Sequence, residues 1–136
     1  MKPIAVICDI DGTLAHMNKR SPYDTSRYHE DSKDETIHYV FSRLSQGATR
    51  IICSGRSENF RAVTTKWLAD NGITYDVMYM RPSNDNRNDT IIKQEIYDRH
   101  IKGKYEVRCV LDDRDRVVSM WRKNGLKVLQ VADGNF

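Results

Sequence analysis

Apolar and polar residues follow one another in blocks along this chain, in a pattern that predicts strands separated by helices. The stretches between apolar runs carry helical periodicity, which places helices at about 31–46, 57–71, 89–101 and 115–124. The apolar runs themselves are expected to form strands, at residues 3–8, 48–53, 75–80, 106–111 and 126–131. Strand alternating with helix favours a parallel sheet covered on both faces. The pattern therefore predicts an α/β fold, a Rossmann-like three-layer sandwich with a five-stranded parallel sheet.

Three of the predicted strands end in polar sequence, namely "CDIDGT", "CSGRS" and "LDDRD". The carboxyl ends of parallel strands lie along one edge of the sheet, and ligands of open α/β sheets bind beyond that edge. These three segments are therefore expected to converge on one functional site.

The chain length is that of a single domain, which we expect to span residues 1–136. It has 136 residues, of which 39% are hydrophobic and 30% charged, enough for one core without disulfides or structural metal. The long polar stretch 16–35 begins with a segment, about 16–30, that is expected to form a flap over the strand ends. Lys19, Arg20 and Arg27 of this flap are candidates for contacts with phosphate groups.

Charge and cysteine usage narrow the picture only a little. A net charge of +3 is compatible with a phosphate-bearing partner and decides nothing alone. No signal peptide or membrane-spanning run is recognisable, which predicts a cytoplasmic protein without a membrane partner. The three cysteines lie in apolar runs at spacings unlike those of zinc ligands, so reduced core thiols are expected.

Two acids one residue apart, Asp9 and Asp11, leave the first predicted strand. A structural interpretation is an Asx-type turn before Gly12. A calcium loop is excluded because Leu14 and Arg20 stand where that loop needs glycine and a bidentate glutamate. The catalytic interpretation makes Asp9 a nucleophile toward phosphorus and Asp11 the general acid and base for the leaving oxygen and for water.

Two carboxylates that face a phosphoryl group would repel it, so the site is expected to hold a cation. Magnesium suits hard oxygen ligands, and Asp112 and Asp113 can add to the set formed by Asp9 and Asp11. Adjacent residues of a strand point to opposite sides, so one of the second pair is expected to bind the metal directly. We favour Asp113 for this bond.

Further candidates follow the other strand ends. Ser54 can bind phosphoryl oxygens where a helix begins, or simply cap that helix. Arg20 and Arg56 are candidates for bidentate phosphate recognition. Asp89 and Lys93 lie four apart on one predicted helix face, so Asp89 can aim the ammonium group and cap the helix. Trp67 and Trp121 are assigned to the core, on their apolar neighbours.

The ordered set Asp-x-Asp-Gly-Thr, Ser-Gly, Lys and Asp-Asp resembles the haloacid dehalogenase (HAD) superfamily, whose members are mostly magnesium-dependent phosphatases that work through an aspartyl-phosphate. The stretches "MNKRSPYD", "TTKWL", "DTIIKQEIYDRHI" and "LDDRDRVVSMWRKNGLKVLQVADGNF" resemble the 3′-phosphatase domain of the T-even-type phage polynucleotide kinase/phosphatase. This second resemblance covers essentially the whole chain.

The resemblance implies roles for the matching residues. Asp9, Asp11, Ser54 and Lys93 are expected to be catalytic, and Asp9, Asp11, Asp112 and Asp113 to surround Mg²⁺. Substrate binding is assigned to Thr13, Arg20, Gly55, Arg56 and Asp89. The implied substrate is the 3′ end of DNA or RNA, the implied setting is nucleic acid repair, and the location is host-cell cytoplasm if a phage encodes the chain.

Two features bear on the scope of this activity. No Gly-x-x-x-x-Gly-Lys-Ser/Thr loop occurs, so 5′-kinase activity is not expected in this chain, and a separate kinase or ligase is a candidate partner. After five strands and four helices, no sequence remains for a large cap domain, which leaves the site open to a polymer end. The sequence is also compatible with a homo-oligomer.

Three other functions are alternatives to a 3′-phosphatase. A phosphatase of nucleotides or other small phosphate esters would use the same residues and is the main alternative. A signalling receiver domain also has an acidic pair and a phosphorylated aspartate, but an acid at the position of Asp11 favours turnover over a stable mark. A catalytically idle nucleic-acid-binding module would need a broken motif, and none is found.

Overall fold

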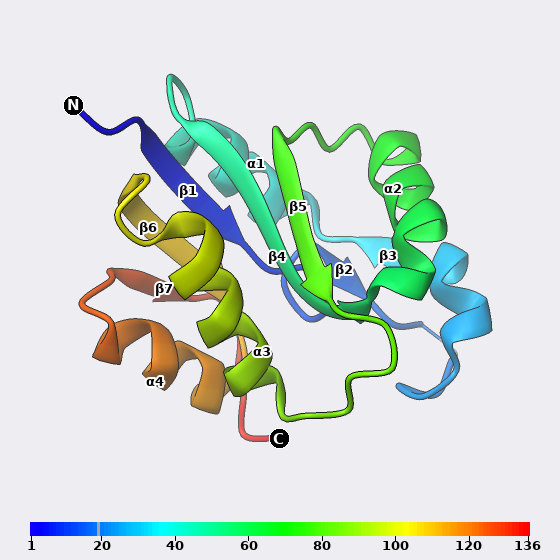
Figure 1. Cartoon of the computed structure of the whole chain (residues 1–136). Helices are drawn as coiled ribbons and strands as arrows, with labels where there is room; N and C mark the ends of the chain where they lie inside the picture. Colours follow the sequence, from blue (N-terminus) through cyan, green and yellow to red (C-terminus); the bar gives the residue numbers. More distant parts are fainter. Residues whose placement is uncertain (19) are drawn as a thin grey trace.

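A five-stranded sheet forms the centre of the computed structural model, which describes residues 1–18 and 20–136 (Figure 1). All its neighbouring strands are parallel, and their order is β5-β4-β1-β6-β7. The strands are β1 (Ile4–Cys8), β4 (Thr49–Ser57), β5 (Val77–Arg81), β6 (Glu106–Asp112) and β7 (Val128–Gln130). The expected α/β fold with a five-stranded parallel sheet is confirmed.

Helices cover both faces of this sheet (Figure 1). The helices α1 (Glu35–Leu44) and α2 (Arg61–Asp70) lie on one face, and α3 (Asp89–Ile96) and α4 (Asp115–Lys123) on the other. The alternation of β1 supplies both cores: Ala5 and Ile7 pack with α3 and α4, whereas Val6 and Cys8 pack with α1 and α2. This burial on both faces is why β1 reads as a continuous apolar run.

Two helices begin later than the periodicity predicts. The expected helix 31–46 starts only at Glu35, because Ser32–Lys33 form a short strand, β3, antiparallel to β2 (Ala15–His16). Asp34 caps the helix by accepting a hydrogen bond from the Ile37 amide at 2.9 Å. The expected helix 57–71 is a short 3-10 turn at Glu58–Phe60 followed by α2.

The strand β4 is correspondingly longer than predicted. It continues beyond Cys53 to Ser57 and pairs with the end of β5, through a register shift between these two positions. Ser54 therefore does not stand at a helix start, as expected from the sequence, and it does not cap α2, which begins at Arg61. The polar residues of β4 after Cys53 resemble the end of a strand in the sequence, but they continue it.

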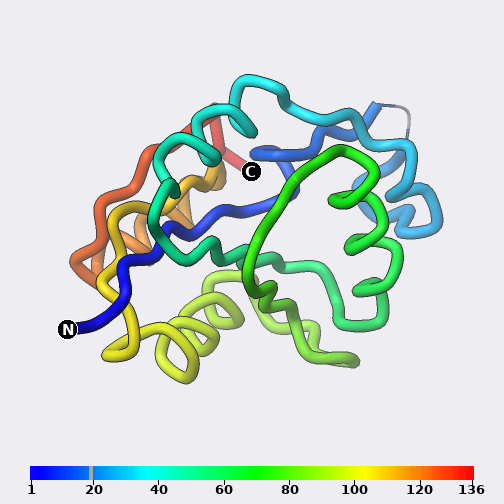
Figure 2. Tube along the Cα trace, turned by 90° about the horizontal axis from the view of Figure 1, so that it is seen from above, coloured from blue at the N-terminus to red at the C-terminus, as the bar shows by residue number. Residues whose placement is uncertain are grey.

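The segment expected to form a flap folds into β2, a 3-10 helix η1 (Thr25–Glu30) and β3. The η1 helix packs against α2 (Figure 2). Beside this contact, the rings of Tyr28 and of Phe60, the residue before α2, meet edge to face with their centroids 5.5 Å apart. Lys19, one of the predicted phosphate contacts, lies outside the described residues. The described residues form no cap domain between the elements of the sandwich.

The three cysteines, Cys8, Cys53 and Cys109, are buried free thiols, as predicted. Burial raises the pKa of Cys53 to about 12, which keeps this thiol protonated and unreactive. No helix in the described part of the chain is long and apolar enough to cross a bilayer.

Residues 131–136 return to the carboxyl end of β6 and brace the Asp112–Asp113 pair from behind. The Val131 amide donates to the Asp112 carbonyl at 3.1 Å, and the Asp115 amide donates to the Gly134 carbonyl at 2.9 Å. Gly134 is buried so tightly that an added Cβ would lie 1.9 Å from the Asp113 carbonyl oxygen. Only glycine fits this approach.

Gly134→Ala is therefore expected to destabilise the protein by about 1–3 kcal/mol, because the clash is with backbone atoms that cannot move aside cheaply. Urea unfolding followed by circular dichroism measures this loss. Asn135→Ala, at an exposed neighbouring position, is the matched control and should change stability little. Equal stability of the two variants would contradict the bracing role.

Candidate active site

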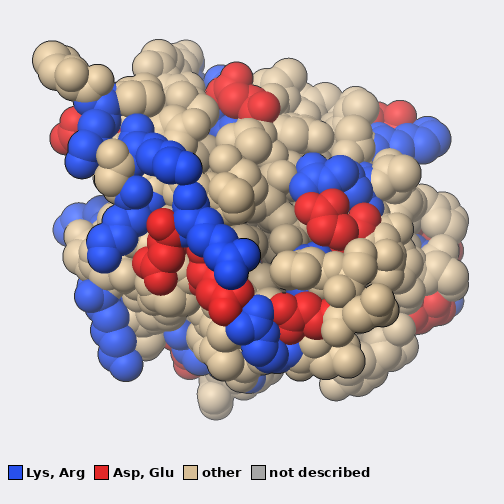
Figure 3. All heavy atoms as spheres, in the orientation of Figure 1, with Lys and Arg blue, Asp and Glu red and all other residues tan. Residues whose placement is uncertain are grey.

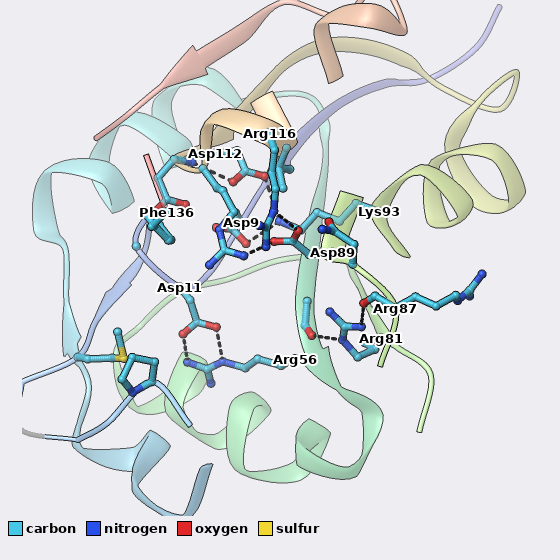
Figure 4. Close-up of a pocket in the computed structure, with 18 of the residues that line it drawn as sticks. Asp9, Asp11, Arg56, Arg81, Arg87, Asp89, Lys93, Asp112, Arg116 and Phe136 are labelled. Carbon is cyan, nitrogen blue, oxygen red and sulfur yellow. Dashed lines mark hydrogen bonds and ion pairs between the residues drawn. The ribbon is translucent and has the colours of Figure 1, made fainter. Parts of the chain in front are cut away.

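The carboxyl ends of β1, β4 and β6 converge on a pocket of about 520 Å³ (Figure 4). Asp9 and Asp11 follow β1, Gly55 and Arg56 belong to β4, and Asp112 ends β6. The helix α3 adds Asp89 and Lys93 to the same pocket. The predicted convergence of the three polar strand ends is therefore confirmed.

A buried ion cluster forms the floor of the pocket. The Lys93 ammonium donates to Asp9 Oδ1 at 2.9 Å and to Asp112 Oδ2 at 3.0 Å. The indole of Trp121 also donates to Asp112 Oδ2, at 3.2 Å, and the fully buried Thr13 hydroxyl donates to Asp9 Oδ2 at 3.3 Å. Both carboxylates are thereby held in position from below the pocket.

Charge in this cluster is unbalanced. Burial and the neighbouring Asp112 raise the pKa of Asp9 well above its ordinary value, and Lys93 offsets this only in part. Burial and Asp112 likewise raise the pKa of Asp113. Burial alone would lower the pKa of Lys93, but Asp112 and Asp9 hold it well above its usual range, so the ammonium stays charged. One lysine therefore faces three carboxyl groups.

The donor set fits a hard divalent cation. One carboxylate oxygen from each of Asp9, Asp112 and Asp113 lies within 4.8 Å of the others. Both acids of the pair contribute an oxygen to this group, because β6 ends at Asp112 and strand alternation does not separate it from Asp113; which of the two binds the metal directly stays a prediction. Gly12 makes room for Asp113, since an added Cβ would lie 2.0 Å from Asp113 Oδ2.

The carboxylate of Asp11 is outside this acidic group and belongs to a second network. Arg56 grips it in bidentate fashion, from Nη2 to Oδ1 at 2.7 Å and from Nε to Oδ2 at 2.9 Å. Its side chain remains 41% exposed at the pocket. The expectation that all four acids surround the metal is therefore not met by the Asp11 side chain in this structure.

A buried carboxylate, Asp31, organises the arginines of this network. Arg20 donates to both oxygens of Asp31, at 2.7 and 2.9 Å, and Arg56 Nη2 donates to Oδ2 at 3.1 Å. The Tyr28 ring lies against both guanidinium groups, at 3.8 Å from Arg56 and 4.7 Å from Arg20. The Trp67 indole fixes the same corner by donating to the Asp31 carbonyl at 2.9 Å. Arg20 is thus buried at the pocket wall, whereas Arg27 pairs with Glu30 on the surface.

Gly55 lines the pocket from β4, whereas its neighbour Ser54 does not. The Ser54 hydroxyl is fully buried and accepts a hydrogen bond from the Arg56 amide at 3.1 Å. A Cβ added to Gly55 would make ordinary van der Waals contacts, at 3.7 Å from Asp89 Cβ and 3.9 Å from Arg81 Nη2. The missing side chain therefore adds room for a ligand.

Asp89 has other partners than the predicted ones. It accepts hydrogen bonds from Arg114 Nη1 at 2.7 Å and Arg116 Nε at 2.9 Å, and it does not bond to Lys93. The cap of α3 is Asn88, whose side chain accepts from the Thr90 amide at 2.9 Å. Helical spacing identified the pocket-lining face correctly but did not identify the contacts.

Sequence reasoning missed several residues of this site, namely Tyr28, Asp31, Arg81, Arg116 and Phe136. Most of them lie outside the motifs along the chain, and Arg116 directly follows "LDDRD" without being part of it. A usable signal existed for Asp31, because two arginines assigned to one pocket need a buried counter-charge. Trp121 was placed correctly in the core, but its bond to Asp112 makes it part of the site as well.

A family model described as the polynucleotide kinase PNKP phosphatase domain matches residues 3–136. The chain belongs to this family. As a PNKP-type phosphatase domain it has the HAD-like fold that the motif order predicted, without a cap domain.

Individual relatives agree with this assignment. The chain is 35% identical over 127 residues to a "Putative bifunctional polynucleotide kinase/RNA ligase" of Autographa californica nuclear polyhedrosis virus, covering 88% of this chain and 18% of the relative. Chains from two structures of a Pnkp1/Rnl/Hen1 complex, one described as an RNA repair complex, superpose with a TM-score of 0.94 at 43% identity. The match covers 99% of this chain and 44% or 48% of those chains. The PNKP-type domain therefore spans less than half of each relative.

Lys93→Met is expected to destabilise the protein by roughly 3–5 kcal/mol near neutral pH, since it leaves buried carboxylates without their cation. The pKa of Asp9 is already raised in the folded wild-type protein, and loss of Lys93 raises it further. The destabilisation of the variant is therefore expected to grow as pH rises above the wild-type pKa of Asp9, where the carboxylate must ionise without its cation, and to shrink as pH falls below it. Urea unfolding at pH 5 and pH 8 measures the difference. Lys66→Met, at an exposed ion pair, is the control and should show little loss. A penalty for Lys93→Met that is independent of pH would contradict the ion-cluster interpretation.

Proposed function

We propose that this domain is a magnesium-dependent polynucleotide 3′-phosphatase that removes the phosphate from DNA or RNA ends during nucleic acid repair. The observation that carries the proposal is the geometry of Asp9, buried at the end of β1 beside Lys93, with a second acid at Asp11 over the open pocket. Membership in the PNKP phosphatase family and likeness to a chain of an RNA repair complex support the substrate class.

In the proposed reaction, a carboxylate oxygen of Asp9 attacks phosphorus and the bond from phosphorus to O3′ breaks. Asp11 gives its proton to the departing O3′. Asp11 then takes a proton from water, whose oxygen attacks the phosphorus of the aspartyl-phosphate, and the bond to Asp9 breaks to release inorganic phosphate. Lys93 and Thr13 hold the Asp9 carboxylate in the orientation for attack.

Arg56 connects substrate binding to this proton transfer. Its guanidinium is bonded to both oxygens of Asp11 and, through Asp31, to the network that holds Arg20. A phosphoryl group competes for the same guanidinium, because planar bidentate recognition suits both carboxylate and phosphate. Phosphate binding would therefore release Asp11 toward the leaving oxygen.

The magnesium ion is assigned to the oxygens of Asp9, Asp112 and Asp113. When bound there, it would supply positive charge that balances the carboxylates and the phosphoryl oxygens. We favour Asp113 as a direct ligand, because Asp112 already accepts bonds from Lys93, Trp121 and the Asp113 amide.

We further propose that a separate kinase or ligase prepares or joins the ends that this domain processes. The names of the relatives combine kinase and RNA ligase functions or place them in a repair complex. The runner-up function is a phosphatase for small phosphate esters, since an uncapped pocket admits those substrates too.

A metal-dependent assay of phosphate release on oligonucleotides with a 3′-phosphate, oligonucleotides with a 5′-phosphate and free mononucleotides tests the function. We expect turnover of the 3′-phosphorylated oligonucleotide to exceed that of the other two. Asp9→Asn should lower it by at least about 10⁴-fold with the fold intact, because an amide oxygen is a poor nucleophile. Asp70→Asn, on the surface of α2, is the control. Equal turnover of mononucleotides would favour the runner-up, and residual activity of Asp9→Asn would exclude the nucleophile assignment.

Magnesium is also expected to stabilise the protein in the absence of substrate. At a concentration of about 100 times Kd, binding would add roughly 2.7 kcal/mol to the free energy of unfolding. The shift in thermal midpoint on adding Mg²⁺ to metal-free protein measures it. Asp113→Asn should abolish most of the shift, whereas Asp70→Asn should keep it. A full shift in Asp113→Asn would assign the ion to other ligands.

A further inference from the structure

Most cations around the pocket are neutralised by a carboxylate. Arg20 and Arg56 share Asp31, Arg114 and Arg116 share Asp89, and Arg87 pairs with Asp85 and Glu95. The surface shows the same mixture, with basic and acidic side chains interspersed over the face that carries α3 and α4 (Figure 3). Pairing with a carboxylate is therefore the usual state of the arginines that line the pocket.

Arg81 departs from this pattern. It ends β5, lines the pocket, and has no carboxylate within 4.0 Å among residues 1–18 and 20–136. Its guanidinium is held by backbone carbonyls: Nε donates to Gly55 at 2.8 Å, and Nη1 donates to Asp85 at 3.0 Å and also to Arg87. Neutral carbonyls fix the group in place without cancelling its charge, so it is preorganised for an anion.

The free edge of this guanidinium faces the pocket. Within the described part of the chain, no residue accepts a hydrogen bond from Nη2, which lies 3.9 Å from the position that a Cβ on Gly55 would take. In the view of Figure 4, Arg81 lies to one side of Asp9, and Phe136 lies on the other side. Arg81 forms no hydrogen bond or ion pair with Asp9, Asp11, Asp112 or Lys93, the groups assigned to the reacting phosphate.

We propose that Arg81 forms a second phosphate subsite, which binds the phosphodiester on the 5′ side of the terminal nucleotide. The terminal phosphate already has Lys93 and Arg56 near Asp9, so a separate preorganised cation at the edge of the pocket fits the next phosphate of a polymer. This inference rests on the proposed 3′-phosphatase function. It also explains how an uncapped pocket prefers a strand end to a small ester, because only the polymer or a 5′-phosphorylated nucleotide offers the second charge.

Three substrates separate the two phosphate sites: a nucleoside 3′-monophosphate, a nucleoside 3′,5′-bisphosphate and a 3′-phosphorylated oligonucleotide. The wild-type protein should prefer the last two. Arg81→Gln should raise KM about tenfold for the substrates that carry the second phosphate, as expected for one charge-assisted contact, and confine the loss to them. It should also lower the slope of log(kcat/KM) against log[salt] by about 0.7 for the oligonucleotide.

Arg108→Gln is the matched control. It removes the same charge from an exposed position on β6, where Arg108 donates to the Leu44 carbonyl away from the pocket. Arg81→Lys is the second variant in case Arg81→Gln fails to fold. It keeps the charge but loses the planar fork, so it should retain the salt slope and raise KM by a smaller factor.

The outcomes that would overturn the Arg81 subsite differ from the one that would contradict the proposed function. A similar loss on the monophosphate and the bisphosphate would overturn the subsite, because Arg81 would then serve the reacting phosphate or the fold. No loss on any substrate, or a wild-type protein without preference for the bisphosphate, would also overturn it. A wild-type protein that releases no phosphate from any 3′-phosphorylated substrate would contradict the proposed function instead.

Discussion

The imbalance of charge around Lys93 is the constraint on which the rest of the site depends. One ammonium group is buried among three carboxyl groups, those of Asp9, Asp112 and Asp113. Such a cluster is costly in a protein interior unless hydrogen bonds and further positive charge complete it. Trp121 and Thr13 supply hydrogen bonds from below, and the open side faces the pocket. A cation and an anionic substrate are what this arrangement leaves room for.

A second network, built on Asp31, holds the arginines that face the same pocket. Asp31 is buried, joins Arg20 to Arg56, and is tied to α2 through Trp67. The ring of Tyr28, on η1, packs against the guanidinium groups of both arginines. The segment between β2 and β3 therefore contributes side chains to the site and also borders it. Asp11, which Arg56 holds in this second network, follows Asp9 of the first by two residues and lines the same pocket, and this is where substrate binding can be coupled to proton transfer.

The surroundings of the pocket are consistent with an extended substrate. The described residues contain no cap domain, and the pocket is bordered by the η1 segment, the loop after β5 and residues 131–136. The relatives that share this fold are longer proteins of which such a domain is a part. The backbone carbonyls of Gly55 on β4 and of Asp85 in the loop after β5 hold the Arg81 guanidinium in place at this border. The Asp9 cluster suits phosphate esters in general and does not distinguish one from another. Residues at the border of the pocket can therefore provide the specificity for one class of phosphate ester.

The sequence by itself determined the sheet, the four helices and the main catalytic candidates. Buried parallel strands leave continuous apolar runs, and acids directly after such runs, as at Asp9 and Asp112, are costly without a function. Short-range patterns could not show that β4 continues through Ser54 and Arg56, because polar residues inside a strand look like its end. Nor could they show that Asp89 binds Arg114 and Arg116 rather than Lys93.

Only the tertiary structure decided which charges meet. Arg81 and Phe136 line the pocket, and Asp31 bonds to two arginines that line it, from segments that carry no motif, whereas Asp11 turns toward Arg56 instead of the acidic cluster. The physical reason is that periodicity records burial, which each residue experiences locally. The pairing of charges depends on distances between residues far apart in the chain, and these exist only after folding.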